Sequence, residues 1–273
     1  MIRIADMDVV FAPGTPDENI ALRRVNLKLD PGDFLTVIGS NGAGKTTLYN
    51  AIAGTVQTAG GRIFIRENRP GGGPAGERDI TREAEYKRAR YIGRIFQNPL
   101  LGTAGRMTLA DNMMLCHKKG YRGLKISLTK SMRDRFREHL RSLGMGLENR
   151  LNDNVELFSG GQRQALTLLM TVMSKPSLLL LDEHTAALDP RNAEMIMDMT
   201  LRFAKDYSLT VMMITHNMAQ ALEFGNRLLM MDRGEIIMDI NAEEKSKLSA
   251  SGIVQRFRDI KKRELDNDEM LLG

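Results

Sequence analysis

Hydrophobic residues alternate with polar ones along the first third of the chain, a pattern typical of strands that bury one face. We predict strands on this ground at residues 2–11, 20–29, 34–38 and 62–65. The N-terminal part of the chain is therefore predicted to be rich in β-structure.

Helical periodicity dominates the middle of the chain. Residues 129–143 form an amphipathic pattern that stops at Gly144, a typical helix C-cap. A second helix is predicted at about 161–174. A third begins at Pro190 behind Asp189, because an aspartate N-cap followed by proline in the first turn favours a helix start.

Apolar strands alternate with these helices, and we predict them at 91–96, 178–181 and 209–215. Such a succession implies crossover connections and therefore a parallel sheet with helices on both faces. Residues 228–240 are predicted to form a hairpin that turns at Arg233-Gly234. The charged tail, residues 241–273, is predicted to begin as a helix and then to fray.

The bulk composition places few limits on this picture. The chain has 273 residues, of which 42% are hydrophobic and 27% charged, as is ordinary for a globular protein. No apolar run approaches the roughly 18 residues of a membrane span, and residues 1–10 contain no apolar signal core. Cys116 is the sole cysteine, which excludes an intrachain disulfide and a thiolate zinc cluster.

A glycine-rich segment between the strand at 34–38 and a helix predicted at 45–53 matches the pattern G-x-x-x-x-G-K-[ST]. Its glycines allow backbone N–H groups to converge on phosphate oxygens, and the following helix adds its N-terminal dipole. Lys45 would reach the β- and γ-phosphates, and the Thr46 hydroxyl would ligate Mg²⁺. The predicted nucleotide-binding residues of this phosphate loop are Gly39, Ser40, Asn41, Gly42, Ala43, Gly44, Lys45, Thr46 and Thr47.

Two acidic residues, Asp182 and Glu183, follow the buried strand at 178–181. They are predicted to lie at the carboxyl edge of the sheet, where ligands of α/β proteins bind. Asp182 would hold Mg²⁺, and Glu183 would orient or deprotonate the attacking water. On its own the pair is equally compatible with a solvated strand end, and the phosphate loop favours the functional interpretation.

Residues 158–162, Phe-Ser-Gly-Gly-Gln, resemble the signature sequence of ABC ATPases, whose usual first residue is leucine. Ser159 precedes Asp182 by 23 positions (182 minus 159), about where that family has it. The resemblance implies that Ser159, Gly160, Gly161 and Gln162 grip the γ-phosphate of an ATP held by a partner chain. Two chains would then pair head to tail as a homodimer with two composite ATP sites.

The resemblance extends over roughly residues 2–240 and implies further roles. Gln97 fits the glutamine that touches Mg²⁺ and the attacking water, and His216 fits the histidine that contacts the γ-phosphate. Residues 187–189 fit the loop that crosses the dimer interface. Phe11 is the candidate for the aromatic ring that stacks on adenine, with core packing as the alternative. His184 stands where the family usually has proline; its imidazole could titrate near physiological pH beside the site, although a tolerated loop substitution is the simpler interpretation.

The fold implied is α/β, a P-loop NTPase (RecA-like) core with an N-terminal antiparallel β subdomain and an inserted α-helical subdomain. We expect a cassette at 1–240, with the helical subdomain at about 98–160, and a separate tail at 241–273. ATP and Mg²⁺ are the expected cofactors.

The function implied is an ATPase subunit that energises a membrane transporter, above all an importer of a small solute such as an amino acid. Because the chain shows no span of its own, we expect separate integral-membrane permease subunits, a solute-binding protein and a position on the cytoplasmic face of the plasma membrane. The apolar segment 98–115 is the expected contact for the permease, although a subdomain core would look the same. An exporter or a non-transport role, such as lipoprotein release or iron–sulfur assembly, is the alternative. No nucleic-acid partner is expected, since the basic run 261–263 is short.

Overall fold

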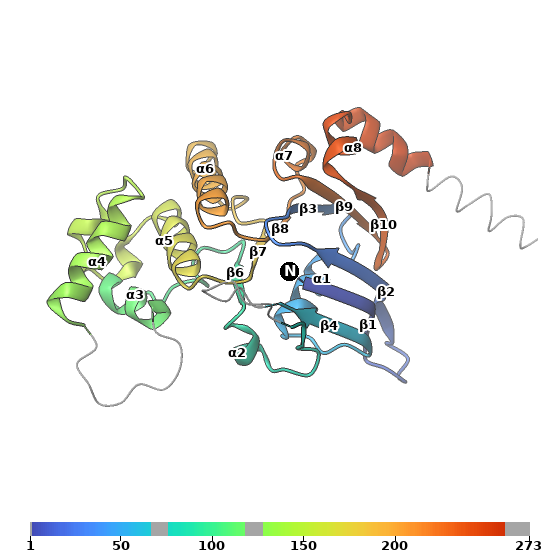
Figure 1. The fold of residues 1–273 in the computed structure, drawn as a ribbon, viewed down its shortest axis with the longest axis horizontal. Coiled ribbons are helices and arrows are strands. Elements are labelled where there is room, and N and C mark those ends of the chain that lie inside the picture. The colour runs from blue at the N-terminus through green and yellow to red at the C-terminus, as the bar shows by residue number, and fades with distance from the viewer. Residues whose placement is uncertain (1, 67–75, 118–127, 260–273) are drawn as a thin grey trace, which may run out of the picture.

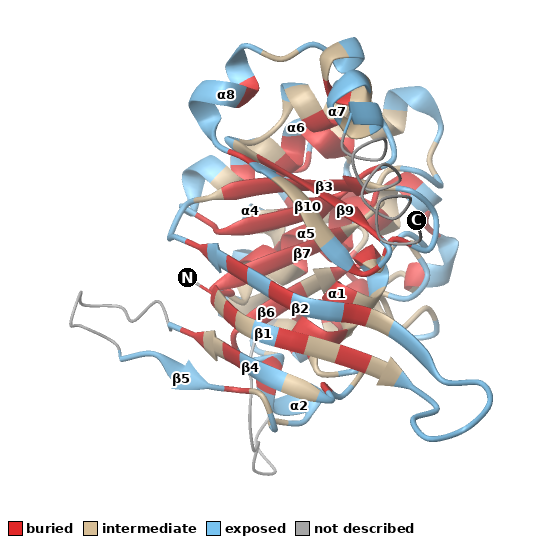
Figure 2. Ribbon diagram, turned by 90° about the vertical axis from the view of Figure 1, so that its right-hand side faces the viewer, coloured by how far each residue is buried: buried red, intermediate tan, exposed pale blue. Residues whose placement is uncertain are grey.

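The computed structural model describes residues 2–66, 76–117 and 128–259, and its strands form two sheets (Figure 1). The first sheet has the strand order β2-β1-β4-β5 and is antiparallel throughout. Side chains of β1 alternate between buried and more exposed positions, as the sequence pattern predicts (Figure 2). Its strands are β1 (Ile2–Phe11), β2 (Asn19–Leu29), β4 (Gly60–Ile65) and β5 (Arg78–Asp79).

The second sheet has the order β10-β9-β3-β8-β7-β6, and all of its pairs are parallel except β9 with β10. Its inner strands are buried on both faces, which explains their continuous apolar sequence. The turn between β9 and β10 falls at Arg233 and Gly234, both with positive φ, as predicted. The strands are β3 (Phe34–Gly39), β6 (Ile92–Ile95), β7 (Leu178–Asp182), β8 (Val211–Ile214), β9 (Arg227–Asp232) and β10 (Glu235–Ile240).

The two sheets share one hydrophobic core around α1 (Lys45–Ala53). Leu48 and Ile52 of this helix are fully buried among side chains from both sheets. Because only residues 40–44 separate the end of β3 from the start of α1, this packing fixes the loop between them relative to both sheets. The short α2 (Glu85–Arg88) precedes β6, and its Arg88 guanidinium donates to the carbonyls of Ala51 and Ile52 at the end of α1.

A second core lies on the other face of the second sheet, under a group of helices (Figure 1). The caps match the sequence: the Thr129 side chain accepts from Met132 N, and Asp189 caps the helix that opens with Pro190. The predicted helix at 129–143 is confirmed to within two residues. These helices are α3 (Leu109–His117), α4 (Lys130–Arg141), α5 (Gly160–Met173) and α6 (Pro190–Asp206), joined by the short η1 (Leu147–Asn149) and η2 (Val155–Leu157).

The tail is helical over α8 (Ala242–Ser246) and again over residues 250–259, as predicted, whereas its last residues and the basic run at 261–263 lie outside the described residues. The start of the tail packs against the rest of the protein, unlike a segment that frays. Lys245 is 5% exposed, and its Nζ donates to the carbonyls of Phe224 and Gly225, just after α7 (Met218–Glu223). Burial lowers the pKa of Lys245 to about 8. The tail is thus fastened to the core beside α7.

The architecture is the predicted one: an antiparallel β unit, a largely parallel sheet of the P-loop NTPase type, and helices packed on it. None of the helices in the described part of the chain combines the length and the apolar content of a membrane span.

Candidate nucleotide-binding site

The phosphate loop runs from the end of β3 to the start of α1, and close contacts at Gly39 and Gly44 leave no room for a side chain at either position. A Cβ on Gly39 would lie 2.3 Å from the Met231 carbonyl oxygen, and one on Gly44 would lie 2.8 Å from Leu22 Cδ2. Gly44 also has φ +95°, a conformation that glycine adopts without strain. Gly39 and Gly44 are therefore required by packing, whereas Gly42 has open space around it and is favoured by its φ of +80°.

Lys45 is the first residue of α1 and is 8% exposed. Its Nζ donates to the carbonyl oxygens of Gly39 and Ser40, at 2.8 and 2.9 Å. Burial lowers the pKa of Lys45, while the nearby carboxylates of Glu183 and Asp182 oppose that shift. The ammonium group is thus held inside the loop, on the path where phosphates would lie.

The two predicted acids lie at the carboxyl end of β7, as expected. Asp182 Oδ2 is 3.6 Å from Arg94 Nη2, and burial raises the pKa of Asp182 although Arg94 opposes it. Glu183 has φ +46°, an uncommon conformation for a non-glycine residue. Its Oε2 lies 3.3 Å from His216 Nδ1, so two residues that are 33 positions apart (216 minus 183) meet at one sheet edge.

A cavity of about 520 Å³ opens at this edge, and Phe11, Lys45 and Glu183 line it together. Phe11 is 42% exposed, which contradicts the alternative that it serves core packing. Arg23 and Arg233 line the cavity too, although the sequence analysis assigned them no role. The full lining is Phe11, Asn19, Ile20, Ala21, Arg23, Asn41, Gly42, Ala43, Gly44, Lys45, Thr46, Thr47, Glu183 and Arg233.

The signature residues do not line this cavity. Ser159 is the N-cap of α5: its hydroxyl oxygen accepts from Gln162 N at 3.2 Å, and Gln162 Oε1 accepts from Ser159 N at 3.1 Å. Gln97 is also absent from the lining and is exposed just beyond β6. One chain therefore brings together the phosphate loop, Glu183 and His216, and leaves the signature elsewhere.

His184 is not a group that titrates near physiological pH, and that part of the sequence prediction is wrong. The residue is 1% exposed, and its Nε2 lies 3.1 Å from Thr200 Oγ1 on α6. Because the Thr200 hydroxyl donates to the carbonyl of Ile196, it accepts from Nε2–H of His184. Burial lowers the pKa of His184 to about 4, so the imidazole is a neutral core side chain.

Oxygen atoms suited to Mg²⁺ are present near the phosphate loop: Thr46 lines the cavity, and the Asp182 carboxylate lies close enough to Lys45 to act on its charge. No cluster of three or more acidic, histidine or cysteine side chains that could hold a metal occurs in the described part of the chain. Such a sparse donor set fits Mg²⁺, which usually keeps several waters and binds one or two side chains together with substrate phosphates.

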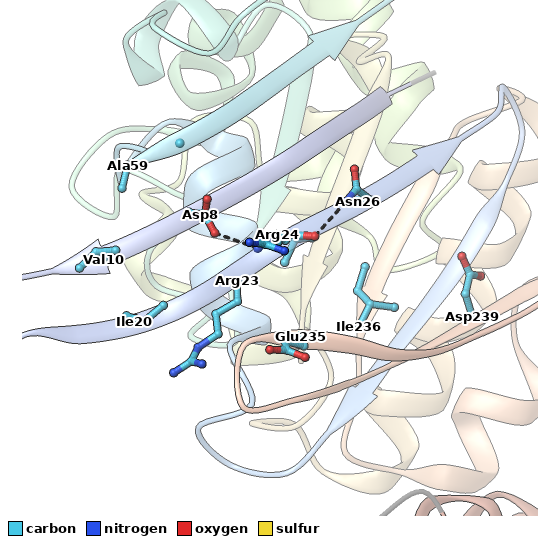
Figure 3. Close-up of a pocket in the computed structure, with 12 residues that line it drawn as sticks. Asp8, Val10, Ile20, Arg23, Arg24, Asn26, Ala59, Glu235, Ile236 and Asp239 are labelled. Atoms are coloured by element: carbon cyan, nitrogen blue, oxygen red, sulfur yellow. Dashed lines mark hydrogen bonds between the residues drawn. The ribbon is translucent and has the colours of Figure 1, made fainter. Parts of the chain in front are cut away.

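A larger cavity, of about 900 Å³, adjoins the first one through Ile20 and Arg23 and lies between the first sheet and the β9–β10 hairpin (Figure 3). Asp8, Arg24 and Glu235 are among its lining residues, and Arg24 N donates to Asp8 Oδ1. It contains none of the predicted site residues, so its size does not make it the site of the chemistry.

Comparison with known proteins gives concordant findings. A family model described as ABC transporter matches residues 22–186. The tyrosine transport ATP-binding protein of Clostridioides difficile (strain R20291) is 35% identical over 260 residues, covering 94% of this chain and 98% of that protein. The phosphonates import ATP-binding protein PhnC of Alcaligenes faecalis is 33% identical over 241 residues, covering 88% and 82%. The ATP-binding cassette MJ0796, solved as a dimer in a post-hydrolysis state bound to ADP and Pi, matches with a TM-score of 0.71 and 25% identity over 89% of this chain and 99% of that chain.

Replacing Phe11 tests whether its ring contacts the base. We expect Phe11→Ala to weaken ATP binding by about 5- to 150-fold, because stacking on an aromatic face contributes roughly 1–3 kcal/mol per base. Phe11→Tyr should bind like the wild type, since it keeps that face. Nucleotide titration measures this, and Tyr86→Ala, which removes an exposed ring away from the cavity, is the control. Equal affinities for the wild type and Phe11→Ala would place the base elsewhere.

The burial of His184 predicts acid sensitivity. In the unfolded chain this residue is protonated as the pH falls through about 6.5, whereas in the folded chain it is protonated only at about pH 4. The stability that this group contributes is complete above pH 6.5 and declines toward pH 4, by about 3 kcal/mol in total. His184→Gln keeps a donor for Thr200 but does not titrate, so its unfolding free energy should fall less steeply with acid. Urea unfolding at several pH values measures both slopes, and equal slopes would contradict the burial argument.

Proposed function

The chain belongs to the ABC transporter family and is an ATP-hydrolysing subunit of it, and we propose that it energises the uptake of an aromatic amino acid such as tyrosine. The family model covers more than half of the chain, and the tyrosine transport relative aligns over nearly its whole length. The single observation that carries the chemistry is the cavity in which Phe11, Lys45 and Glu183 meet. An exporter or non-transport role finds no support among the relatives named above, which are described as transport or import proteins.

The roles proposed for the side chains follow from their positions. Backbone N–H groups of the phosphate loop and the Lys45 ammonium bind the β- and γ-phosphates. Glu183 orients the attacking water and accepts its proton, and His216, 3.3 Å from that carboxylate, contacts the γ-phosphate. Thr46, Asp182 and Gln97 would hold Mg²⁺, which neutralises phosphate charge when bound.

The site is proposed to be completed by a second copy of the chain. Ser159, Gly160 and Gly161 stand at the N-terminus of α5 and do not line the cavity of their own chain. A helix N-terminus binds phosphate through its free N–H groups and its dipole. Each signature would therefore close the ATP site of the partner in a head-to-tail homodimer, and the solved relative is itself dimeric.

A permease is the second proposed partner. Leu100, Leu101 and Leu115 are more than half exposed, around the loop after β6 and on α3. Exposed large apolar side chains that gather in one region mark interaction sites. We assign this surface to an integral-membrane permease, which would place the chain at the inner face of the membrane, and we propose a solute-binding protein as a further partner. The division into a cassette at 1–240, with its helical part at about 98–160, and a tail at 241–273 is part of the same proposal.

The dimer is tested with Glu183→Gln. This variant should bind ATP, fail to hydrolyse it and accumulate as a closed homodimer, because the contacts of Lys45 remain while repulsion between the carboxylate and the γ-phosphate is removed. Adding Ser159→Arg should restore the monomer by blocking the partner's γ-phosphate. Size-exclusion chromatography with light scattering, in ATP and in ADP, distinguishes the states, and Glu223→Gln is the control outside the cavity. Monomers at every ATP concentration, with and without permease, would exclude the ATP-closed dimer.

The transported solute is tested by uptake. Cells that lack this gene should lose ATP-dependent uptake of labelled tyrosine, the wild-type gene should restore it, and Lys45→Ala should not, because Lys45 binds the phosphates. Competition by unlabelled phenylalanine and by a phosphonate separates an aromatic amino-acid importer from a phosphonate importer. Unchanged tyrosine uptake in the deletion strain would contradict the proposed substrate class.

A further inference from the structure

Helix α5 carries the signature at its first turn and is attached there to the loop that follows Glu183. A Cβ on Gly161 would lie 2.8 Å from Cγ of Asn192, so the helix start and this side chain are in direct contact. Asn192 in turn donates to Asp189 through Nδ2, at 2.5 Å, and Asp189 caps α6. Asn192 belongs to the first turn of α6, and a Cβ on Gly160 would lie 3.7 Å from Leu188 Cδ2, so the start of α5 lies against both α6 and the loop that precedes it.

One turn further along α5, Gln164 makes a second attachment. It is 1% exposed, and its Nε2 donates to the carbonyl oxygen of His184 at 2.7 Å and to that of Phe96 at 3.2 Å. Phe96 directly precedes Gln97, and His184 directly follows Glu183. The side-chain amide of Gln164 thus connects two main-chain segments, and each segment carries a residue proposed to act on the attacking water.

The hydrogen bonding of Gln164 is one-sided. Its Oε1 is buried and has no hydrogen-bond partner in the described part of the chain. A buried polar atom without a partner is costly, so a residue kept only for core packing would favour an apolar side chain here. The peptide that accepts from Nε2 belongs to the segment where Glu183 adopts φ +46°, a conformation that persists only when its surroundings hold it.

We propose that Gln164 is a positioning residue that transmits movement of the signature helix to Gln97 and Glu183. The inference rests on the proposed function, in which α5 grips the ATP of the partner while Gln97 and Glu183 act on the ATP of their own chain. When the signature closes on the ATP of the partner, the movement of α5 then changes the positions of Gln97 and Glu183 at the ATP of their own chain. Gln164 thereby couples the two composite sites without touching either nucleotide.

Gln164→Met tests the positioning role, because it keeps the length and the burial and removes both N–H donors. We expect kcat to fall about tenfold or more while ATP affinity changes by less than about twofold, since small displacements of catalytic groups are costly whereas phosphate contacts are untouched. The control is Thr171→Val on the same helix, whose hydroxyl donates only to the carbonyl of Thr167 within α5. Gln164→Asn withdraws the amide by about 1.5 Å and provides a second variant if methionine prevents folding.

Hydrogen exchange gives a readout independent of turnover. Exchange in peptides covering 96–98 and 183–189 should rise in Gln164→Met and stay at the wild-type level in Thr171→Val. A loss of kcat with unchanged exchange, or wild-type kcat in both Gln164 variants, would overturn the proposal.

The coupling is tested by the dependence of turnover on ATP concentration. The Hill coefficient of the wild type, expected near 2 for two linked sites, should fall toward 1 in Gln164→Met. A wild type with a Hill coefficient of 1 would argue against the paired sites of the proposed function. In that case the positioning role would still be decided by kcat and exchange.

Discussion

The phosphate loop can follow its course only because it packs closely against two parts of the chain that are far apart in sequence. A Cβ on Gly44 would meet Leu22 Cδ2 and the Ala21 carbonyl oxygen of β2, and also Gly234 Cα of the β9–β10 turn. The main chain completes the clamp, since Gly234 N donates to the Ala43 carbonyl and Arg23 N donates to the Gly234 carbonyl. The antiparallel sheet, the parallel sheet and the loop are therefore fixed to one another through glycine positions. A side chain at Gly44 would push the loop, and with it the N-terminus of α1 that supplies the dipole for phosphate binding, away from β2 and the β9–β10 turn.

The elements around this clamp were predictable because their signals are local. Alternation identified β1, the cap at Asp189 identified the start of α6, and Arg233-Gly234 identified the hairpin turn. The position of Asp182 and Glu183 at the carboxyl edge followed from a general property of α/β sheets, whereas His216 was assigned from the family resemblance and is found 3.3 Å from Glu183. Local pattern and sheet topology thus accounted for most of the fold, and the sequence motifs together with the family resemblance identified the residues of the site.

The features that escaped prediction depend on tertiary contacts. His184 is adjacent to Glu183 in sequence, yet its side chain turns into the core toward Thr200, and nothing in a single sequence reveals that direction. Arg233 reaches the cavity only because the hairpin docks on the phosphate loop. Gln164 is two residues beyond the signature and reads as an ordinary polar position on a helix. Its significance comes from the two carbonyl groups that happen to face it.

The capping box at Ser159 has a kinetic consequence. The hydroxyl oxygen already accepts from Gln162 N, and its hydrogen is still available to donate. In the proposed dimer the Ser159 hydroxyl would donate a hydrogen bond to a phosphate oxygen while its oxygen still caps α5. The surface that meets the partner's nucleotide is therefore already ordered before the two chains associate. Preorganised surfaces avoid the entropic cost of ordering loops, and association then need not wait for a segment to fold. The lifetime of the closed dimer would then be determined by how long the enclosed γ-phosphate remains bound to the nucleotide.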